Sequence, residues 1–99
     1  MINNVFRVDG DSMKDVGLHD GLFVEVKQKE VSIGDIVVVR IDGKIFIKQY
    51  DISDGKVIFR SKNKNYEDIS FFLEYEILGV VTWIFSWISF VIFNLSLAK

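Results

Sequence analysis

Cysteine is absent from the 99-residue sequence, and His19 is its single histidine. Without cysteine the chain can form neither a disulfide framework nor a thiolate metal site, which is compatible with a reducing cytoplasm. A Ser/His/Asp or Cys/His catalytic site would depend on that one imidazole, which lies in a polar turn and is expected to be solvated. A serine activated by a lysine is therefore the simpler arrangement for this chain.

An excess of positive charge is also missing, because 14 acidic side chains outnumber 12 basic ones and leave a net charge of −2. Lys62 and Lys64 lie close together, but Glu67 and Asp68 follow them, which is typical of a solvated loop. The composition therefore argues against this chain binding DNA by itself. Residues 1–20 are polar and mixed in charge, so no secretory signal is expected.

Hydrophobic residues make up 49% of the chain, enough for the core of one small domain over residues 1–99. Short apolar segments between glycine turns predict an all-β fold, a small and partly open β-barrel with one or two short helical turns. Strands are expected at 5–8, 22–27, 36–41, 45–50, 56–60 and 76–81, a helical turn at 13–17, and loops at 28–34 and 61–68. The strand at 36–41 is apolar almost throughout and should be buried on both faces. Within and after the loop at 61–68, Tyr66 and Ile69 are able to fold back onto the core.

The segment Val-Asp-Gly-Asp-Ser-Met at 8–13 contains a candidate nucleophile, Ser12. This serine follows Gly-Asp at the point where an apolar strand gives way to a polar turn. It therefore lies at the end of a rigid element, where its hydroxyl can point outward. Glycine, aspartate and serine are also the usual residues of turns, so this motif alone leaves a purely structural role open.

A candidate base, Lys48, follows in a predicted hairpin. The Asp42-Gly43 pair lies between apolar runs and predicts a two-residue turn with both residues at positive φ. Side-chain alternation after the turn places Lys48 between Phe46 and Tyr50 on one face of the strand. Burial there would lower the lysine pKa and leave a neutral amine able to accept a proton. The alternative is a lysine that protects an edge strand from aggregation.

Five segments carry a family resemblance. They read VDGDSMKDVGLHDGLFVEV at 8–26, GDIVVVR at 34–40, IKQY at 47–50, NKNY at 63–66 and EILGVV at 76–81. In this order and spacing they resemble the catalytic domain of LexA, UmuD and the lambda-type phage repressors. Those proteins are Ser/Lys peptidases that cleave their own chain, and the resemblance covers about residues 6–81.

The resemblance implies a role for each candidate residue. Ser12 would be the nucleophile and Lys48 the general base, and the backbone N–H groups of Asp11 and Ser12 would form the oxyanion hole. No metal or other cofactor is implied. Leu22 stands where the family usually has an acidic residue, and we expect only a surface difference from this.

The resemblance also implies partners. The domain would be a homodimer whose substrate is its own upstream segment, cleaved when a RecA filament on single-stranded DNA favours the engaged conformation during the DNA-damage response. DNA would be bound only through a helix-turn-helix domain that this chain does not contain. The family cuts an Ala-Gly or Cys-Gly bond upstream of the serine, and the present sequence contains neither pair.

The end of the chain allows two interpretations, because residues 77–98 contain no charged side chain. A membrane helix needs about 20 apolar residues, so a bilayer anchor is possible by length. We favour instead a last strand that runs to about Phe85, with the remaining apolar surface of the tail (82–99) buried against a second copy.

Two other functional classes stay open at this point. A signal-peptidase-like enzyme also uses serine and lysine and is anchored in the membrane, but it usually has a proline after the Ser-Met pair, which is absent at Ser12-Met13. A catalytically idle dimerisation module would contain the same two residues without using them.

Overall fold

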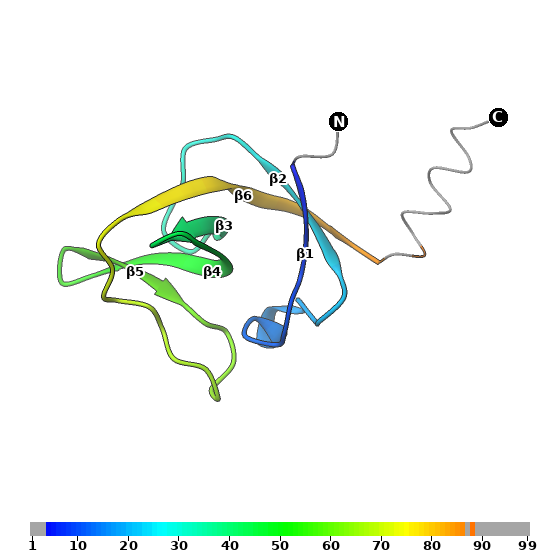
Figure 1. The fold of residues 1–99 in the computed structure, drawn as a ribbon, viewed down its shortest axis with the longest axis horizontal. Coiled ribbons are helices and arrows are strands. Elements are labelled where there is room, and N and C mark those ends of the chain that lie inside the picture. The colour runs from blue at the N-terminus through cyan, green and yellow to red at the C-terminus, as the bar shows by residue number, and fades with distance from the viewer. Residues whose placement is uncertain (1–3, 87, 89–99) are drawn as a thin grey trace.

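The computed structural model describes residues 4–86 and 88, and these form one antiparallel sheet (Figure 1). Its elements are β1 (Val5–Arg7), the 3-10 helix η1 (Lys14–Val16), β2 (Phe23–Lys27), β3 (Ile36–Ile41), β4 (Lys44–Ser53), β5 (Lys56–Arg60) and β6 (Tyr75–Phe85). The strand order is β1-β2-β6-β3-β4-β5, which makes β1 and β5 the edge strands. The all-β prediction is confirmed, and the sheet is open rather than closed into a barrel.

The longest strand, β6, joins the two halves of the sheet, because it pairs with β2 on one side and β3 on the other. Figure 1 shows it passing over the length of the molecule. Gly79 of β6 lies against Val26 of β2, and a Cβ atom at Gly79 would come within 2.6 Å of Val26 Cγ2. The glycine therefore permits the close approach of β2 and β6. As expected from the sequence, β6 continues to Phe85.

The β3–β4 hairpin and the β4–β5 hairpin each turn at an Asp-Gly pair. Asp42 and Gly43 have φ values of 47° and 86°, and Asp54 and Gly55 have 52° and 76°. The predicted left-handed turn at Asp42 is confirmed, since aspartate is among the few residues that tolerate this conformation. The strand between the turns is longer than predicted and extends to Ser53.

Two clusters of buried side chains form the core. The first contains Val8, Met13, Leu18, Val24, Val26 and Val38, and the second contains Val37, Val39, Ile41, Phe59 and Val80. Strand β3 contributes to both clusters because successive side chains point to opposite faces. The prediction that 36–41 is buried on both faces is confirmed.

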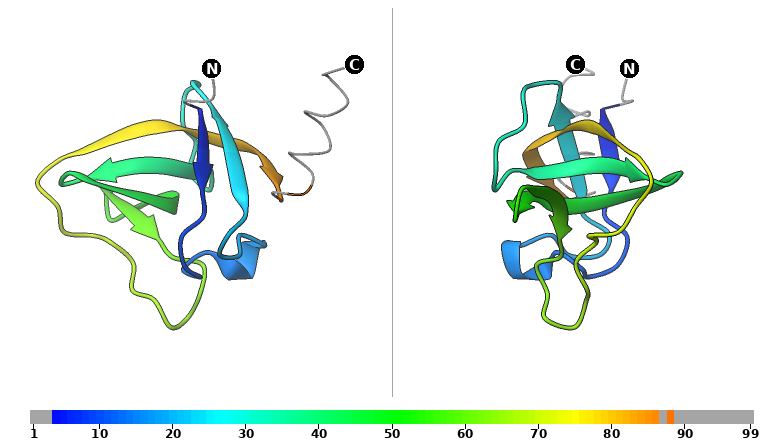
Figure 2. Two further views of the ribbon diagram at one scale, coloured as in Figure 1. Left: turned by 45° about the vertical axis from the view of Figure 1, so that its right-hand side comes forward. Right: turned by 90° about the vertical axis from the view of Figure 1, so that its left-hand side faces the viewer.

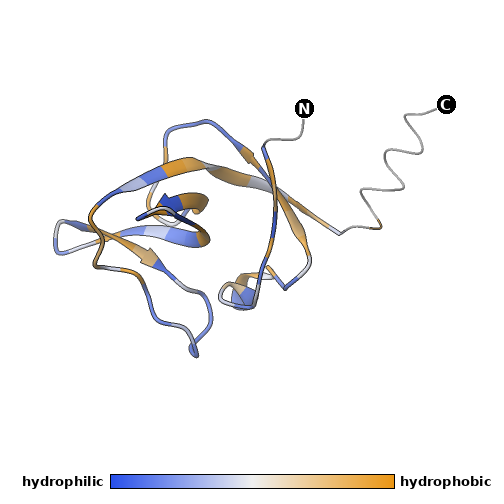
Figure 3. Ribbon diagram, in the orientation of Figure 1, coloured by the Kyte–Doolittle hydropathy of each residue, from blue (hydrophilic) through white to orange (hydrophobic). Residues whose placement is uncertain are grey.

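The connection from β5 to β6 differs in part from the predicted exposed loop at 61–68. Its tip is hydrophilic (Figure 3), but Asn63 is only 7% exposed. Ile69 packs on the second cluster and forms a bridge with Phe59, as predicted. Tyr66, in contrast, is 45% exposed, so of the two residues able to fold back only Ile69 does so. Asn63 is buried because its side chain and the Lys62 backbone attach the start of this connection to the turn at residues 11–15.

The interpretations of the chain end concern mainly residues outside the described part, since positions 87 and 89–99 are not among the described residues. Over residues 4–86 and 88, no helix has the length and apolar character needed to cross a bilayer. Trp83 and Ile84 near the end of β6 are exposed.

Candidate active site

Ser12 lies in the turn between β1 and η1, and the residues after it anchor that turn. Met13 and Leu18 are both buried in the first core cluster and face each other in an isolated bridge. Gly17 closes η1 in the left-handed conformation, with φ of 86°. Ser12 itself is half-buried, and its hydroxyl makes no hydrogen bond to any of the residues that the structure describes. The Ser12 hydroxyl is thus available to a substrate, while the buried Met13 and Leu18 anchor its turn to the core.

Lys48 lies on β4 opposite Val37 of β3 and is 5% exposed. Because Lys48 is buried on a strand that is not at the edge of the sheet, the alternative of an edge-strand lysine was wrong. The Nζ atom lies 5.8 Å from the centre of the Phe46 ring, and no ion pair with Lys48 is present in the described part of the chain. Burial lowers the pKa of the Lys48 amine, and the negative charge of Asp68 opposes that effect in part.

Among the described residues, the amine of Lys48 has one side-chain hydrogen-bond partner, the Ser61 hydroxyl. Lys48 Nζ donates to Ser61 Oγ at 2.8 Å, and Ser61 Oγ donates to the Glu67 carbonyl at 2.9 Å. A hydroxyl has a single proton, so Ser61 is the acceptor toward Lys48. The lone pair of a neutral Lys48 amine therefore stays available for another proton donor.

Consecutive residues after β5 contact both candidate residues. While Ser61 accepts from Lys48, the Lys62 N–H donates to the Ser12 carbonyl at 2.8 Å. The Asp15 N–H in turn donates to the Lys62 carbonyl, also at 2.8 Å. Figures 1 and 2 show the η1 turn and the start of the β5–β6 connection side by side at one end of the molecule. No direct hydrogen bond joins Ser12 and Lys48 among the described residues.

The backbone N–H groups of Asp11 and Ser12 donate to no acceptor within residues 4–86 and 88. The neighbouring Gly10 N–H, in contrast, donates to Asp20 Oδ1 at 2.7 Å. Two adjacent donors beside a serine are the arrangement that can stabilise an oxyanion.

Ser61 and Asn63 were missed by the sequence reasoning. Asn63 Nδ2 donates to the Asp11 carbonyl at 2.9 Å, and Asn63 Oδ1 accepts from the Asn65 N–H at 3.0 Å. The available signal was position, because Ser61 directly follows a strand and Asn63 begins the NKNY segment. The partners that connect them to the candidate residues, Asp11 and Lys48, are remote in sequence, so position alone does not identify these contacts.

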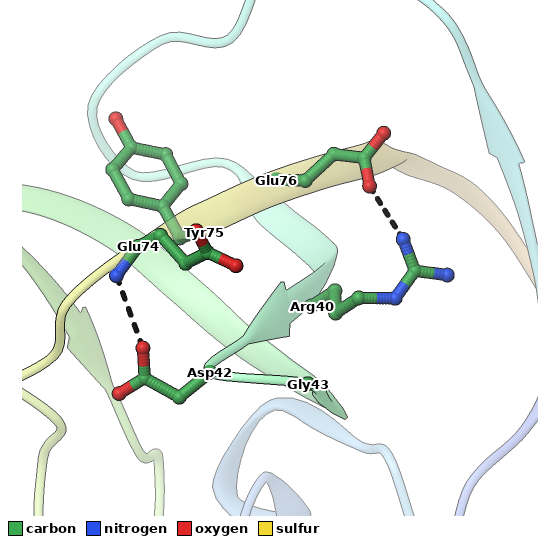
Figure 4. A pocket seen from close by; sticks show the side chains of 6 residues that line it. All are labelled: Arg40, Asp42, Gly43, Glu74, Tyr75 and Glu76. Atoms are coloured by element: carbon green, nitrogen blue, oxygen red, sulfur yellow. Dashed lines mark hydrogen bonds and ion pairs between the residues drawn. The ribbon is translucent and has the colours of Figure 1, made fainter.

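A separate cleft of about 220 Å³ lies at the β3–β4 turn (Figure 4), lined by Arg40, Asp42, Gly43, Glu74, Tyr75 and Glu76. Its charged groups are largely used within the fold. The Asp42 carboxylate accepts from the N–H groups of Leu73 and Glu74, and Arg40 pairs with Glu76. In the described ranges no group of three or more His, Cys, Asp or Glu side chains is suited to a metal ion. The cleft includes neither candidate catalytic residue. Its charged groups connect the β3–β4 turn to the start of β6, which is a structural role.

Comparison with known proteins agrees with the residue pattern. Residues 4–82 match the family model described as Peptidase S24-like. The LexA repressor of Vibrio atlanticus is 32% identical over 77 residues, which cover 77% of this chain and 37% of that protein. The LexA repressor of Clostridium perfringens (strain 13 / Type A) is 39% identical over 66 residues, which cover 66% of this chain and 32% of that protein. The chain thus spans about a third of the length of these relatives.

Proposed function

This chain belongs to the Peptidase S24-like family, and from that premise we propose that it is a serine peptidase domain with Ser12 as nucleophile and Lys48 as general base. The observation that carries the proposal is the buried Lys48 amine, whose pKa is lowered by burial and whose hydroxyl partner only accepts from it. A lysine without an ion-pair partner is costly to bury while charged, and proton abstraction requires the neutral form.

In the proposed reaction, Lys48 Nζ takes the hydroxyl proton as Ser12 Oγ bonds to the carbonyl carbon of a peptide. The carbonyl oxygen becomes an oxyanion held by the N–H groups of Asp11 and Ser12. Collapse breaks the C–N bond, and Lys48 returns the proton to the leaving amine nitrogen. Water then hydrolyses the acyl ester with Lys48 again as base, which restores both side chains.

The proposed substrate is a segment upstream of this domain in a longer repressor-like protein. Two relatives named LexA repressor support this, and the chain spans only about a third of each. On this proposal the domain works in the cytoplasm as a homodimer. Cleavage depends on a RecA filament, and it separates the peptidase domain from a DNA-binding part of the longer protein.

The test uses two variants and two matched controls. Ser12→Ala and Lys48→Ala should each reduce cleavage of a peptide containing an Ala-Gly bond by roughly 10³-fold or more. Ser53→Ala and Lys56→Ala change exposed residues of the same types and should retain wild-type rates. Cleavage products are quantified by mass spectrometry over a range of pH, with a RecA filament on single-stranded DNA present in every reaction. Unchanged cleavage by Lys48→Ala would remove the base from the mechanism, and a folded but inactive wild type would favour the idle dimerisation module.

A further inference from the structure

Asn63 and Lys48 are the two polar or charged side chains buried in the described part of the chain. A buried amide is unfavourable unless its donors and acceptors are paired. Asn63 meets this requirement locally through the Asn65 N–H, but its donor is directed to the Asp11 carbonyl, 52 positions away in the sequence. The position of this amide is therefore tied to the turn that contains Ser12.

The carbonyl that Asn63 holds belongs to the peptide group whose N–H is that of Ser12. A trans peptide is planar, and its C=O and N–H bonds point in opposite directions. Fixing the Asp11 carbonyl oxygen at 2.9 Å from Asn63 Nδ2 therefore fixes the direction of the Ser12 N–H, which points away from Asn63.

The next peptide group is fixed by the neighbouring residue. The Lys62 N–H donates to the Ser12 carbonyl at 2.8 Å, so consecutive residues 62 and 63 hold the carbonyls on both sides of Ser12. The Ser12 N–H between these two contacts has no acceptor within residues 4–86 and 88. A donor that is rigidly directed yet unpaired is suited to meet charge that develops only during a reaction.

We propose that Asn63 is a positioning residue, which orients the Ser12 N–H toward the oxyanion of the acyl-transfer transition state. This inference rests on the proposed peptidase function for its chemistry. Asn63 acts through the Asp11–Ser12 peptide and touches neither the substrate nor Ser12 Oγ. The hydrogen bond to the carbonyl also polarises the same peptide group and strengthens its N–H as a donor.

The test replaces Asn63 in two ways. Asn63→Ala removes both hydrogen bonds, whereas Asn63→Asp retains an acceptor for the Asn65 N–H and loses the donor to Asp11. Asn65→Ala is the matched control. It removes an exposed side-chain amide from the same loop and keeps the backbone N–H at position 65 that donates to Asn63. Each variant is examined for kcat and KM on the Ala-Gly peptide with the RecA filament present, and separately for the ¹⁵N order parameter of the Ser12 N–H.

We expect kcat to fall roughly tenfold to hundredfold in both Asn63 variants with little change in KM, less than the ~10²–10³ for deleting an oxyanion donor. The Ser12 N–H order parameter should fall from about 0.85 toward 0.6. Asn65→Ala should match the wild type in both measurements. A wild-type order parameter or wild-type kcat in both Asn63 variants would overturn the inference.

The proposed function fails by a different result, namely full cleavage by Ser12→Ala. In that event the order parameter of the Ser12 N–H still decides whether Asn63 orients this group, because the NMR measurement does not depend on cleavage.

Discussion

Replacing Ser61 by alanine should have two effects. It should lower the stability of the domain, and it should shift the pKa of Lys48. The variant loses two hydrogen bonds, from Lys48 Nζ at 2.8 Å and to the Glu67 carbonyl at 2.9 Å. Each is worth about 0.5–1.5 kcal/mol net, so the free energy of unfolding should fall by about 1–3 kcal/mol. For a domain of this length, each kcal/mol lowers Tm by roughly 4–8 °C.

The effect on Lys48 has a defined direction. Burial already lowers the pKa of the Lys48 amine, and Ser61 Oγ is an acceptor that favours the ammonium form. Removing the acceptor should lower the pKa further, so the alkaline rise of the cleavage rate should move to lower pH. The pKa is measured from the ¹³Cε resonance of Lys48, which needs no substrate.

Two controls separate this effect from loss of any serine hydroxyl. Ser53→Ala removes an exposed serine from β4 and should change stability by no more than about 0.5 kcal/mol. Ser61→Thr keeps the hydroxyl and should keep the Lys48 titration near that of the wild type. If Ser61→Ala unfolds in urea at the same midpoint as Ser53→Ala, or leaves the ¹³Cε titration unchanged, the assigned role of Ser61 is refuted.

Three further predictions concern stability and pH. Gly79→Ala should destabilise the domain by about 1–3 kcal/mol in urea unfolding, because the new Cβ would meet Val26 Cγ2 at 2.6 Å; wild-type stability would contradict this packing. Asp68→Asn removes the charge that raises the Lys48 pKa, so the alkaline limb of the rate should move to lower pH, and a move to higher pH would reverse our assignment. Lys48→Met should abolish cleavage and stabilise the domain at pH 7. Because the folded Lys48 pKa lies below its ordinary 10.5, the unfolded chain binds more protons between these values. Wild-type stability should therefore rise with pH across that window and Lys48→Met should lack the rise, which urea unfolding at several pH values checks.

The parts of the fold that could be predicted were those set by local chemistry. The Asp42-Gly43 turn followed from two residues that tolerate positive φ, and its geometry is confirmed. Burial on both faces of 36–41 followed from a continuous apolar run, and it too is confirmed. The burial of Lys48 followed from alternation beside Phe46.

The remaining features depend on contacts between distant segments. The burial of Asn63 was not predicted, because asparagine and lysine are common in exposed loops and the partner Asp11 lies 52 positions earlier. In the same way, no residue near Ser61 in the sequence indicates that its hydroxyl accepts a hydrogen bond from Lys48, which lies 13 positions earlier on β4. The catalytic roles of Ser12 and Lys48 stay predictions.

The most direct test of the account is covalent labelling with a fluorophosphonate, which reacts with activated serines and needs no knowledge of the natural substrate. Mass spectrometry of the labelled wild type should find one adduct on Ser12, formed faster as pH rises and Lys48 loses its proton. Lys48→Met should form that adduct far more slowly. Labelling of Ser12 at the same rate in Lys48→Met, or an adduct only on another serine, would contradict the claim that Lys48 activates Ser12.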